Sequence, residues 1–349
     1  MDVFNHPAFD NHEAIHFVRD AASGLRAIIA VHSTRLGPAT GGCRFWPYES
    51  EAAALTDALR LSRGMTYKNA MADLPLGGGK AVIIGDPKKI KTPELLEAFG
   101  AAVQHLDGQY VTAEDVGVGV PDMEIVSRKT RYVAGLANKS GDPSPKTAHG
   151  VFQGIRAAVA FQLKRKDLKG LRVAVQGLGH VGYHLCEELH AAGAKLVVSD
   201  INTVAVDRAV EVFGAKAFAP EDILFQPVDV LAPCALGGVL NEGTIPGLQT
   251  HIVAGAANNQ LLTAADGECL RNRGILYAPD YIINAGGIIN VAREMGALSE
   301  TQVRDKIENI HDTLLRIFER AAREGKATSV VADELARSRL KSAGLQVAA

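Results

Sequence analysis

The motif Gly177-Leu-Gly-His-Val-Gly182 constrains the fold of this chain more than any other segment. The apolar run LRVAVQ precedes it and an amphipathic stretch follows, so the glycines are predicted to form a strand-to-helix turn. The next β-branched run, AKLVVSD, ends at Asp200 and completes a βαβ unit. Further short runs, VDVLAPC, HIVAGA and ILYAPD, alternate with helical stretches, which predicts an α/β fold with a doubly wound parallel sheet.

This turn also predicts a dinucleotide site. Gly177 would permit the tight turn, Gly179 would let the backbone approach a pyrophosphate, and Gly182 would let helix and strand pack closely. Asp200 lies at the end of the second strand, where its carboxylate would accept hydrogen bonds from ribose hydroxyls and repel a 2′-phosphate. No arginine follows it before Arg208, so the expected cofactor is NAD rather than NADP.

The N-terminal half of the chain predicts another α/β layer. Its expected elements are a strand over 25–31, a turn-rich loop over 36–42, a helix over 51–65, a strand over 81–85, a helix over 93–105 and a strand over 109–113. This arrangement places Lys68 just past the end of a helix, Lys80 at the start of a strand, and Asp115 just after the last strand.

The second half begins after the segment SGDPSPKT, over 140–147, which interrupts both periodicities and suggests a hinge. A helix is expected over about 150–163. Near the C-terminus one long helix is expected, with an apolar face made of Val303, Ile307, Ile310, Leu314, Ile317 and Ala321. At 349 residues the chain is long enough for two domains with a cleft between them.

Composition excludes several classes of function. The net charge of -2 gives no field that draws the protein to nucleic acid or to a membrane surface, so small molecules are the expected partners. The cysteines Cys43, Cys186, Cys234 and Cys269 lack CxxC spacing and are expected to be reduced and mostly buried. No histidine pair has ligand spacing, so no metal site is expected. Without a signal peptide or a long apolar run, a cytoplasmic location is expected.

Lys68, Lys80 and Asp115 suggest proton chemistry. The three glycines before Lys80 would let it approach a ligand closely. Two ammonium groups in one cleft repel each other, which lowers the pKa of the less solvated lysine so that it can act as a base near neutral pH. The other lysine stays charged and can bind a carboxylate. A single lysine would more simply be a solvated surface charge, so the hypothesis depends on the combination.

The segments that carry these residues resemble a known family. GPATGGCRFWPY, RGMTYKNAMADLPLGGGKAVI, YVTAEDVG, GDPSPKTAHGV, VAVQGLGHVG, VAGAANNQL and ILYAPDYIINAGGIINVA resemble, in order and spacing, those of the leucine, valine and phenylalanine dehydrogenases. The resemblance implies NAD-dependent, reversible oxidative deamination of an apolar L-amino acid to its 2-oxo acid and ammonia. It also implies a substrate-binding and oligomerisation domain over 1–135, a Rossmann domain over 145–325, and a C-terminal helix over 326–349 that returns to the first domain.

The same resemblance implies a role for each site residue. Lys80 matches the catalytic lysine, Asp115 the acid that exchanges protons with the substrate nitrogen, and Lys68 the lysine that holds the substrate carboxylate. Asn259 is expected near substrate and nicotinamide, and Thr147 near the nicotinamide amide. We further expect substrate contacts from Gly41, Gly42 and Met65, and cofactor contacts from Leu178, His180, Val181, Ala235, Ala256 and Asn258.

Thr40, Ala113, Ile288 and Val291 match positions that line the side-chain pocket in the resembling enzymes. Three of the four are apolar, which favours an aliphatic or aromatic substrate and disfavours glutamate. Thr40 stands where a leucine is expected in the leucine enzymes, which leaves room for a larger substrate. Because a methylene in a pocket is worth only about 1–3 kcal/mol, leucine, valine, isoleucine, methionine and phenylalanine all stay open.

Two alternatives stay open beside this interpretation. A 2-hydroxy-acid oxidoreductase could use the same nucleotide domain, but His32, His105 and His180 lie in no motif and the paired lysines would have no role. A non-catalytic NAD-binding regulator would be expected to lack a catalytic residue. The chain is expected to form a homo-oligomer, a dimer or an octamer, through the face after Thr301 or the segment before Leu25.

Overall fold

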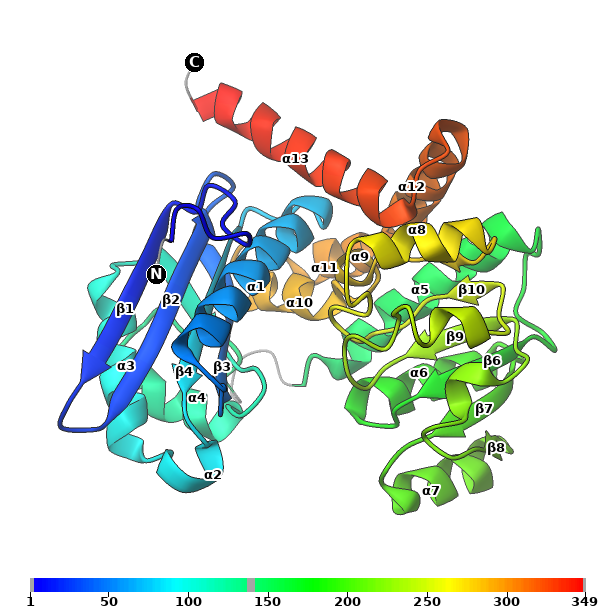
Figure 1. Cartoon of the computed structure of the whole chain (residues 1–349), viewed down its shortest axis with the longest axis horizontal. Coiled ribbons are helices and arrows are strands. Elements are labelled where there is room, and N and C mark those ends of the chain that lie inside the picture. The colour runs from blue at the N-terminus through cyan, green and yellow to red at the C-terminus, as the bar shows by residue number, and fades with distance from the viewer. Residues whose placement is uncertain (1–2, 137–141, 348–349) are drawn as a thin grey trace. The chain divides into compact units, whose positions relative to one another are not determined.

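The computed structural model describes residues 3–136 and 142–347. The chain divides into two compact units, each of which is described by itself (Figure 1). The first comprises Met1–Gly141, Val291–Ser299 and Ala336–Ala349, and the second comprises Asp142–Asn290 and Glu300–Leu335. This division differs from the predicted ranges of 1–135, 145–325 and 326–349, because Val291–Ser299 belongs to the first unit and the second extends to Leu335.

The first unit is built on a five-stranded mixed sheet with the strand order β1-β2-β4-β3-β5. Strands β1 and β4 pair antiparallel with β2, whereas β3 pairs parallel with both β4 and β5. The strands are β1 (Ala14–Asp20), β2 (Leu25–Ser33), β3 (Ala39–Trp46), β4 (Gly77–Ile84) and β5 (Tyr110–Ala113). Strand β1 was not predicted, and β3 occupies part of the segment predicted as a loop over 36–42.

Helices cover both faces of this sheet. Helix α1 (Glu51–Met71) packs on one face, where Ala54, Leu55, Ala58 and Leu59 form a core with Ile28, Ala30 and Val82 (Figure 1). The other face packs against α3 (Pro93–His105) and α4 (Val120–Ser127). The short helix α2 (Pro87–Ile90) follows β4. Because alternate residues of a strand face opposite sides, Lys80 shares the α1 face with Val82.

Two sequence predictions about this unit were wrong. Helix α1 does not end at Met65 but continues to Met71, since no glycine or proline interrupts residues 65–71, and Lys68 therefore lies in its last turn. Strand β4 begins at Gly77 and not after the glycines, so Lys80 lies inside the strand. A run of glycines is a common loop signal, but here the small size of glycine allows the strand to pack closely.

The second unit contains a six-stranded parallel sheet with the order β11-β10-β9-β6-β7-β8. Its strands are β6 (Arg172–Gln176), β7 (Lys195–Ser199), β8 (Lys216–Ala217), β9 (Val230–Pro233), β10 (Ile252–Val253) and β11 (Leu276–Tyr277). Counted from β6, this is the order 6-5-4-1-2-3, which is that of a Rossmann sheet, so the predicted α/β fold class is confirmed. The edge strand β8 was not predicted.

The helices of the second unit are α5 (Ser144–Gln162), α6 (His180–Ala191), α7 (Thr203–Phe213), α8 (Ala265–Asn272), α9 (Asp280–Ile283), α11 (Glu300–Glu308) and α12 (Ile310–Glu324). They pack on the second sheet and, in the case of α11 and α12, on other helices (Figure 1). Two short 3-10 turns lie at Ile223–Phe225 and Ile245–Gly247. Helices α10 (Gly286–Glu294) and α13 (Thr328–Val347) each contain residues of both units.

Two helix predictions for this half were also wrong. The expected long helix is divided at Asn309 into α11 and α12, although the predicted apolar face of six residues is buried throughout. Helix α5 begins at Ser144 rather than Gly150, because Pro145 is compatible with a first helical turn. The described part of the expected hinge thus includes the start of this helix, and Ser140 and Gly141 lie outside the described residues.

The cysteines and the helix lengths bear on two further expectations. All four cysteines are free thiols. Cys43 and Cys186 are buried as expected, Cys234 is partly buried, and Cys269 is exposed and so differs from the expectation. Among the residues that the structure describes, no helix is long and apolar enough to span a membrane.

Candidate functional site

Lys80 and Asp115 form an ion pair in the first unit. Lys80 extends from β4, is only 6% exposed, and places its Nζ 2.5 Å from Oδ2 of Asp115, which follows β5. The charged group in contact with Lys80 is thus a carboxylate. A buried lysine paired with a carboxylate forms a proton-exchanging pair within hydrogen-bond reach.

Two glycines of β3 permit the close packing around this pair. A β-carbon on Gly42 would lie 2.5 Å from the carbonyl oxygen of Glu114 and 2.8 Å from the β-carbon of Asp115. A β-carbon on Gly41 would lie 1.9 Å from the carbonyl oxygen of Gly79 and 3.2 Å from Cγ of Met65. Gly41 and Gly42 therefore set how closely Asp115 and α1 approach the sheet.

The three glycines before Lys80 have a packing role that differs from the predicted one. A β-carbon on Gly77 would lie 2.1 Å from the carbonyl oxygen of Ser33, one on Gly78 would lie 2.1 Å from the backbone nitrogen of Thr66, and one on Gly79 would lie 2.6 Å from the ring of Tyr110. These contacts are with the protein itself. The glycines therefore bring α1 and the neighbouring strands close to Lys80, which fixes the strand that carries it.

Lys68 and Met65 lie on the same face of α1, three residues apart and near its C-terminal end. Both side chains are partly exposed. The buried neighbours Thr66 and Asn69 anchor this turn: Thr66 packs over Gly78, and the Asn69 amide donates a hydrogen bond of 2.5 Å to the carbonyl oxygen of Gly77. The turn that presents Lys68 is therefore tied to the strand that presents Lys80.

Sequence reasoning missed Arg44, which is the second cation at Asp115. Its Nε lies 3.2 Å from Oδ2 of Asp115, and its Nη1 lies 2.9 Å from Oδ2 of Asp57 in α1. Asp57 also accepts a hydrogen bond of 2.6 Å from the hydroxyl of Tyr48. The sequence signal that could have identified Arg44 is its position two residues after Gly42 in one strand. Residues at i and i+2 of a strand share a face, so Arg44 faces the same side as Gly42.

These cations determine the charge state of Asp115. Burial opposes the ionised form, but the Lys80 ammonium and the Arg44 guanidinium outweigh burial and lower the pKa of Asp115 to about 2. Asp115 is therefore ionised at neutral pH in the resting protein.

The predicted substrate-pocket residues differ in exposure. Thr40 is fully buried in β3 beside Gly78 and Val111, and its hydroxyl donates to the carbonyl oxygen of Pro38 at 3.1 Å. Thr40 therefore presents no exposed surface. Ala113, at the end of β5, is partly exposed. Ile288 and Val291 are partly exposed and lie three residues apart on α10.

The glycine motif in the second unit forms the turn between β6 and α6. Gly177 has a φ of +99°, which favours glycine, and a β-carbon on it would lie 2.9 Å from Ala235. A β-carbon on Gly182 would lie 2.0 Å from the carbonyl oxygen of Gly177, whereas one on Gly179 would meet open space. Gly177 therefore allows the tight turn, Gly179 leaves an open face for a phosphate, and Gly182 allows the helix to pack closely.

Asp200 lies directly after β7 and braces this turn. Its Oδ2 accepts a hydrogen bond of 2.6 Å from the backbone nitrogen of Leu178, and its Oδ1 accepts one of 2.7 Å from that of Asn202. Within the described residues, no side chain caps the N-terminus of α6. The backbone N–H groups of that helix end are thus available to a phosphate, and the turn fits a dinucleotide.

The remaining predicted cofactor contacts, and Asn259, which is predicted to bind substrate, lie on loops and helix ends of the second unit. Asn259 has a φ of +52°, and its backbone oxygen accepts a hydrogen bond of 2.7 Å from Gly238. The side-chain oxygen of Asn258 accepts one of 2.8 Å from Asn284. Thr147 lies in the first turns of α5, where its hydroxyl donates to Pro143 at 3.1 Å. His180 and Val181 begin α6, Ala235 follows β9, and Ala256 follows β10.

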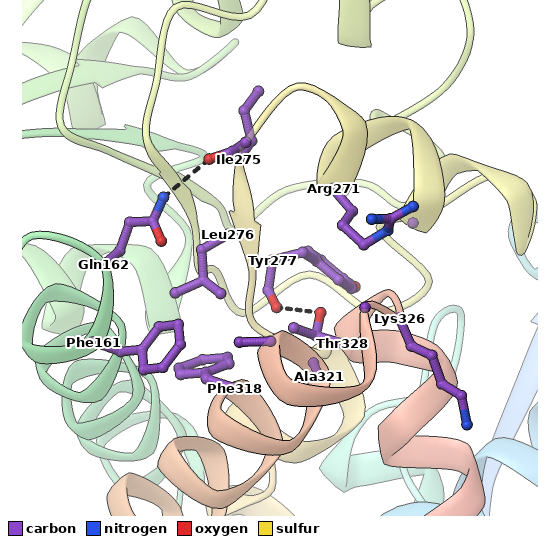
Figure 2. Close-up of a pocket in the computed structure, with 14 residues that line it drawn as sticks. Phe161, Gln162, Arg271, Ile275, Leu276, Tyr277, Phe318, Ala321, Lys326 and Thr328 are labelled. Carbon is purple, nitrogen blue, oxygen red and sulfur yellow. Dashed lines mark hydrogen bonds between the residues drawn. The ribbon is translucent and has the colours of Figure 1, made fainter.

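A cavity of about 270 Å³ in the second unit contains none of the predicted site residues. Figure 2 shows the rings of Phe161 and Phe318 next to each other, with the side chain of Leu276 toward them and the ring of Tyr277 pointing away. Its polar groups are already paired: Gln162 with Gly274, Thr328 with Tyr277, Arg271 with Glu268, and Lys326 with Glu334. No proton-transfer pair like Lys80 and Asp115 occurs among its lining residues. Across the described ranges, no histidine, cysteine and carboxylate cluster could hold a metal.

Models of two protein families match most of the chain. A model of the Glu/Leu/Phe/Val dehydrogenase dimerisation domain matches residues 12–132, and one of Glutamate/Leucine/Phenylalanine/Valine dehydrogenase matches residues 141–209 and 202–344. The chain is similar to a leucine dehydrogenase of Geobacillus stearothermophilus, with 51% identity over 98% of this chain and 94% of the relative. It is 48% identical to a valine dehydrogenase of Streptomyces coelicolor, over 95% of this chain and 93% of the relative.

A solved structure extends the similarity to three dimensions. The crystal structure of L-tryptophan dehydrogenase from Nostoc punctiforme has 47% sequence identity and a TM-score of 0.84, and the match covers 95% of this chain and 97% of that one.

Proposed function

We propose a specific reaction from the premise that the chain belongs to the glutamate/leucine/phenylalanine/valine dehydrogenase family. The chain is an amino-acid dehydrogenase, an oxidoreductase that oxidatively deaminates an L-amino acid. In our proposal the substrate is an apolar L-amino acid, the cofactor is NAD, and the products are a 2-oxo acid and ammonia. The observation that carries the proposal is the buried Lys80–Asp115 pair.

The second unit supports NAD over NADP. The open face above Gly179 and the N-terminus of α6 would bind the pyrophosphate through backbone N–H groups. Asp200 places a carboxylate at the end of β7, where it would accept hydrogen bonds from the adenosine ribose and repel a 2′-phosphate. We expect Asn258, Asn259 and Thr147 to contact the nicotinamide end.

The pocket positions support an apolar substrate. Ala113, Ile288 and Val291 are apolar and partly exposed, so a charged substrate side chain would lose hydration without gaining a partner from them. Relatives with 51%, 48% and 47% identity are a leucine, a valine and a tryptophan dehydrogenase, all named after apolar amino acids. In our proposal Lys68 binds the substrate carboxylate, which is common to all of these substrates.

Each residue of the pair has its own step. Asp115 takes a proton from the substrate ammonium group, and bound NAD would supply the hydride acceptor for Cα, which would leave an iminium carbon. Lys80, in its neutral form, takes a proton from the water that attacks this carbon. Asp115 exchanges protons with the substrate nitrogen so that ammonia departs and a 2-oxo acid remains. Lys80 Nζ and Asp115 Oδ2 lie 2.5 Å apart, so the two groups can act on one substrate carbon and its nitrogen.

NADH formation tests this proposal directly. Purified protein is incubated with NAD or NADP and leucine, valine, isoleucine, phenylalanine, tryptophan or glutamate, with the matching 2-hydroxy acids as controls. We expect turnover with NAD and apolar amino acids. Turnover restricted to glutamate would contradict the substrate, a preference for NADP would contradict the cofactor, and turnover of hydroxy acids alone would contradict the mechanism.

Light scattering tests our further proposal of a homo-oligomer, a dimer or an octamer, formed through the dimerisation domain.

A further inference from the structure

Arg44 is held on two sides within the first unit. Its Nε lies 3.2 Å from Oδ2 of Asp115, and its Nη1 lies 2.9 Å from Oδ2 of Asp57. The hydroxyl of Tyr48 donates to the same Asp57 oxygen at 2.6 Å. A guanidinium with two fixed partners on separate elements has a defined orientation. Arg44 therefore presents a fixed positive charge to Asp115 from the same sheet face as Lys80.

We propose that Arg44 is a positioning residue that keeps the Asp115 carboxylate ionised and in place during the part of the reaction in which Lys80 is neutral. This inference rests on the proposed function, in which Lys80 acts as a base. Lys80 and Arg44 both contact Oδ2 of Asp115, so both cations hold the same oxygen of this carboxylate. Without Arg44, the neutral state of Lys80 would leave a largely buried carboxylate without either of the two cations that pair with it in the described structure.

The charges around the site support this division of labour. A lysine can lose its proton, whereas a guanidinium stays charged throughout the pH range in which proteins work. A buried carboxylate that loses its only cation takes up a proton, and a protonated Asp115 could no longer accept one from the substrate nitrogen. Asp57 neutralises the charge of Arg44, so the arrangement adds no net charge to the pocket.

The other titratable groups next to the pair do not take over this role. Burial raises the pKa of the Cys43 thiol and, together with Asp57, that of the Tyr48 phenol, so both stay neutral at working pH. For Arg44 itself, burial opposes the charged form, but Asp115 and Asp57 outweigh burial and raise its pKa. Arg44 therefore stays charged whatever the state of Lys80.

Turnover of Arg44 variants gives the first test. We expect Arg44→Met to lower kcat by roughly 10- to 100-fold, with a smaller change in KM, because a misplaced Asp115 affects the chemistry more than carboxylate binding. The acid limb of the pH profile of kcat should move to higher pH. Arg44→Lys, which keeps the charge, should restore most of the rate and the position of the limb. The control is Arg26→Met. Arg26 lies in the same sheet but pairs with Glu51 instead of Asp115.

An infrared titration of Asp115 tests the proposal without turnover. Lys80→Met represents the neutral lysine, and Asp115→Asn in the same background identifies the Asp115 carboxyl band. We expect this band to stay that of an ionised carboxylate well below neutral pH in Lys80→Met and in Lys80→Met/Arg26→Met. In Lys80→Met/Arg44→Met the band of the protonated acid should appear at a clearly higher pH. In Lys80→Met/Arg44→Lys, which keeps a cation at position 44, the band should stay that of the ionised carboxylate. The lysine variant also serves as the comparison if the double methionine variant folds poorly.

The outcomes separate this proposal from the proposed function. A carboxyl band that titrates identically with and without Arg44 overturns the role of Arg44, as does an Arg44→Met enzyme with the wild-type kcat and acid limb. If the wild-type protein turns over no amino acid with NAD, the proposed function fails. The infrared titration then still decides whether Arg44 keeps Asp115 ionised.

Discussion

Gly42 and Asp115 lie so close together that the site cannot accommodate a side chain at position 42. A β-carbon on Gly42 would lie 2.8 Å from the β-carbon of Asp115 and 2.5 Å from the Glu114 carbonyl oxygen, both below the contact distances that real β-carbons show. The carboxylate that pairs with Lys80 thus owes its position to the absence of a side chain on the neighbouring strand.

Gly42→Ala should therefore impair catalysis more than folding. The added methyl group displaces Asp115 from Lys80, and a displacement of about 1 Å can lower kcat by about 100-fold. We expect a loss of stability of about 1–3 kcal/mol from the crowding. Steady-state kinetics and thermal unfolding measure the two effects.

Gly64→Ala is the matched control for this change. A β-carbon on Gly64 in α1 would meet open space, so alanine should be neutral for kcat and stabilise the helix by up to about 1 kcal/mol. If Gly42→Ala kept the wild-type kcat, the close approach would have no role in positioning Asp115.

Asp200 is expected to determine the choice of cofactor. Asp200→Ser removes the carboxylate that would repel a 2′-phosphate, while a hydroxyl remains as an acceptor for the turn at Leu178. The ratio of kcat/KM for NAD to that for NADP should fall by roughly 10-fold or more, because like-charge repulsion at such a site costs more than 1 kcal/mol. Asp207→Ser, in the helix that follows, is the control. If Asp200→Ser left the ratio of kcat/KM for NAD to that for NADP unchanged, Asp200 would not contact the adenosine ribose.

The second unit should lose stability at alkaline pH through His149. Its hydrogen bond with Glu188 and that with Glu308 outweigh burial and raise the pKa of His149 to about 9. Because the folded-state pKa lies above the ordinary value of 6.5, this stabilisation is complete below pH 6.5 and is lost as the pH rises through about 9.

His149→Gln should flatten this part of the pH dependence. Thermal unfolding across the alkaline range compares the variant with the wild type, and His105→Gln, at the exposed end of α3, is the control. Equal slopes for His149→Gln and the wild type would show that the His149 ion pairs contribute nothing measurable.

The fold of the second unit could be predicted well from its sequence, because each βα step of a doubly wound sheet is local. Gly177, Gly182 and Asp200 lie within one such step, so spacing alone placed them at one turn. The short edge strand β8 escaped prediction because two residues carry no periodicity. The division of α11 from α12 escaped it because the apolar face continues across Asn309.

The site in the first unit could be predicted only in part. The resemblance to known dehydrogenases suggested Lys80 and Asp115, but the pairing of Arg44 with Asp115 joins residues 71 positions apart in the sequence, which no local pattern encodes. The run of glycines at 77–79 predicts close approach of a ligand to Lys80, whereas the neighbours of these glycines are Ser33, Thr66 and Tyr110. Such contacts depend on how strands and helices pack, and that information is not local.

The central claim is that Lys80 carries the proton chemistry, and the kcat of Lys80→Ala with NAD and an apolar amino acid tests it most directly. Arg44 remains to pair Asp115 in this variant, so the fold should persist, as circular dichroism can check. We predict a kcat lower by roughly 10²- to 10⁴-fold, as for loss of a general base. A folded Lys80→Ala enzyme with near wild-type kcat would contradict the account.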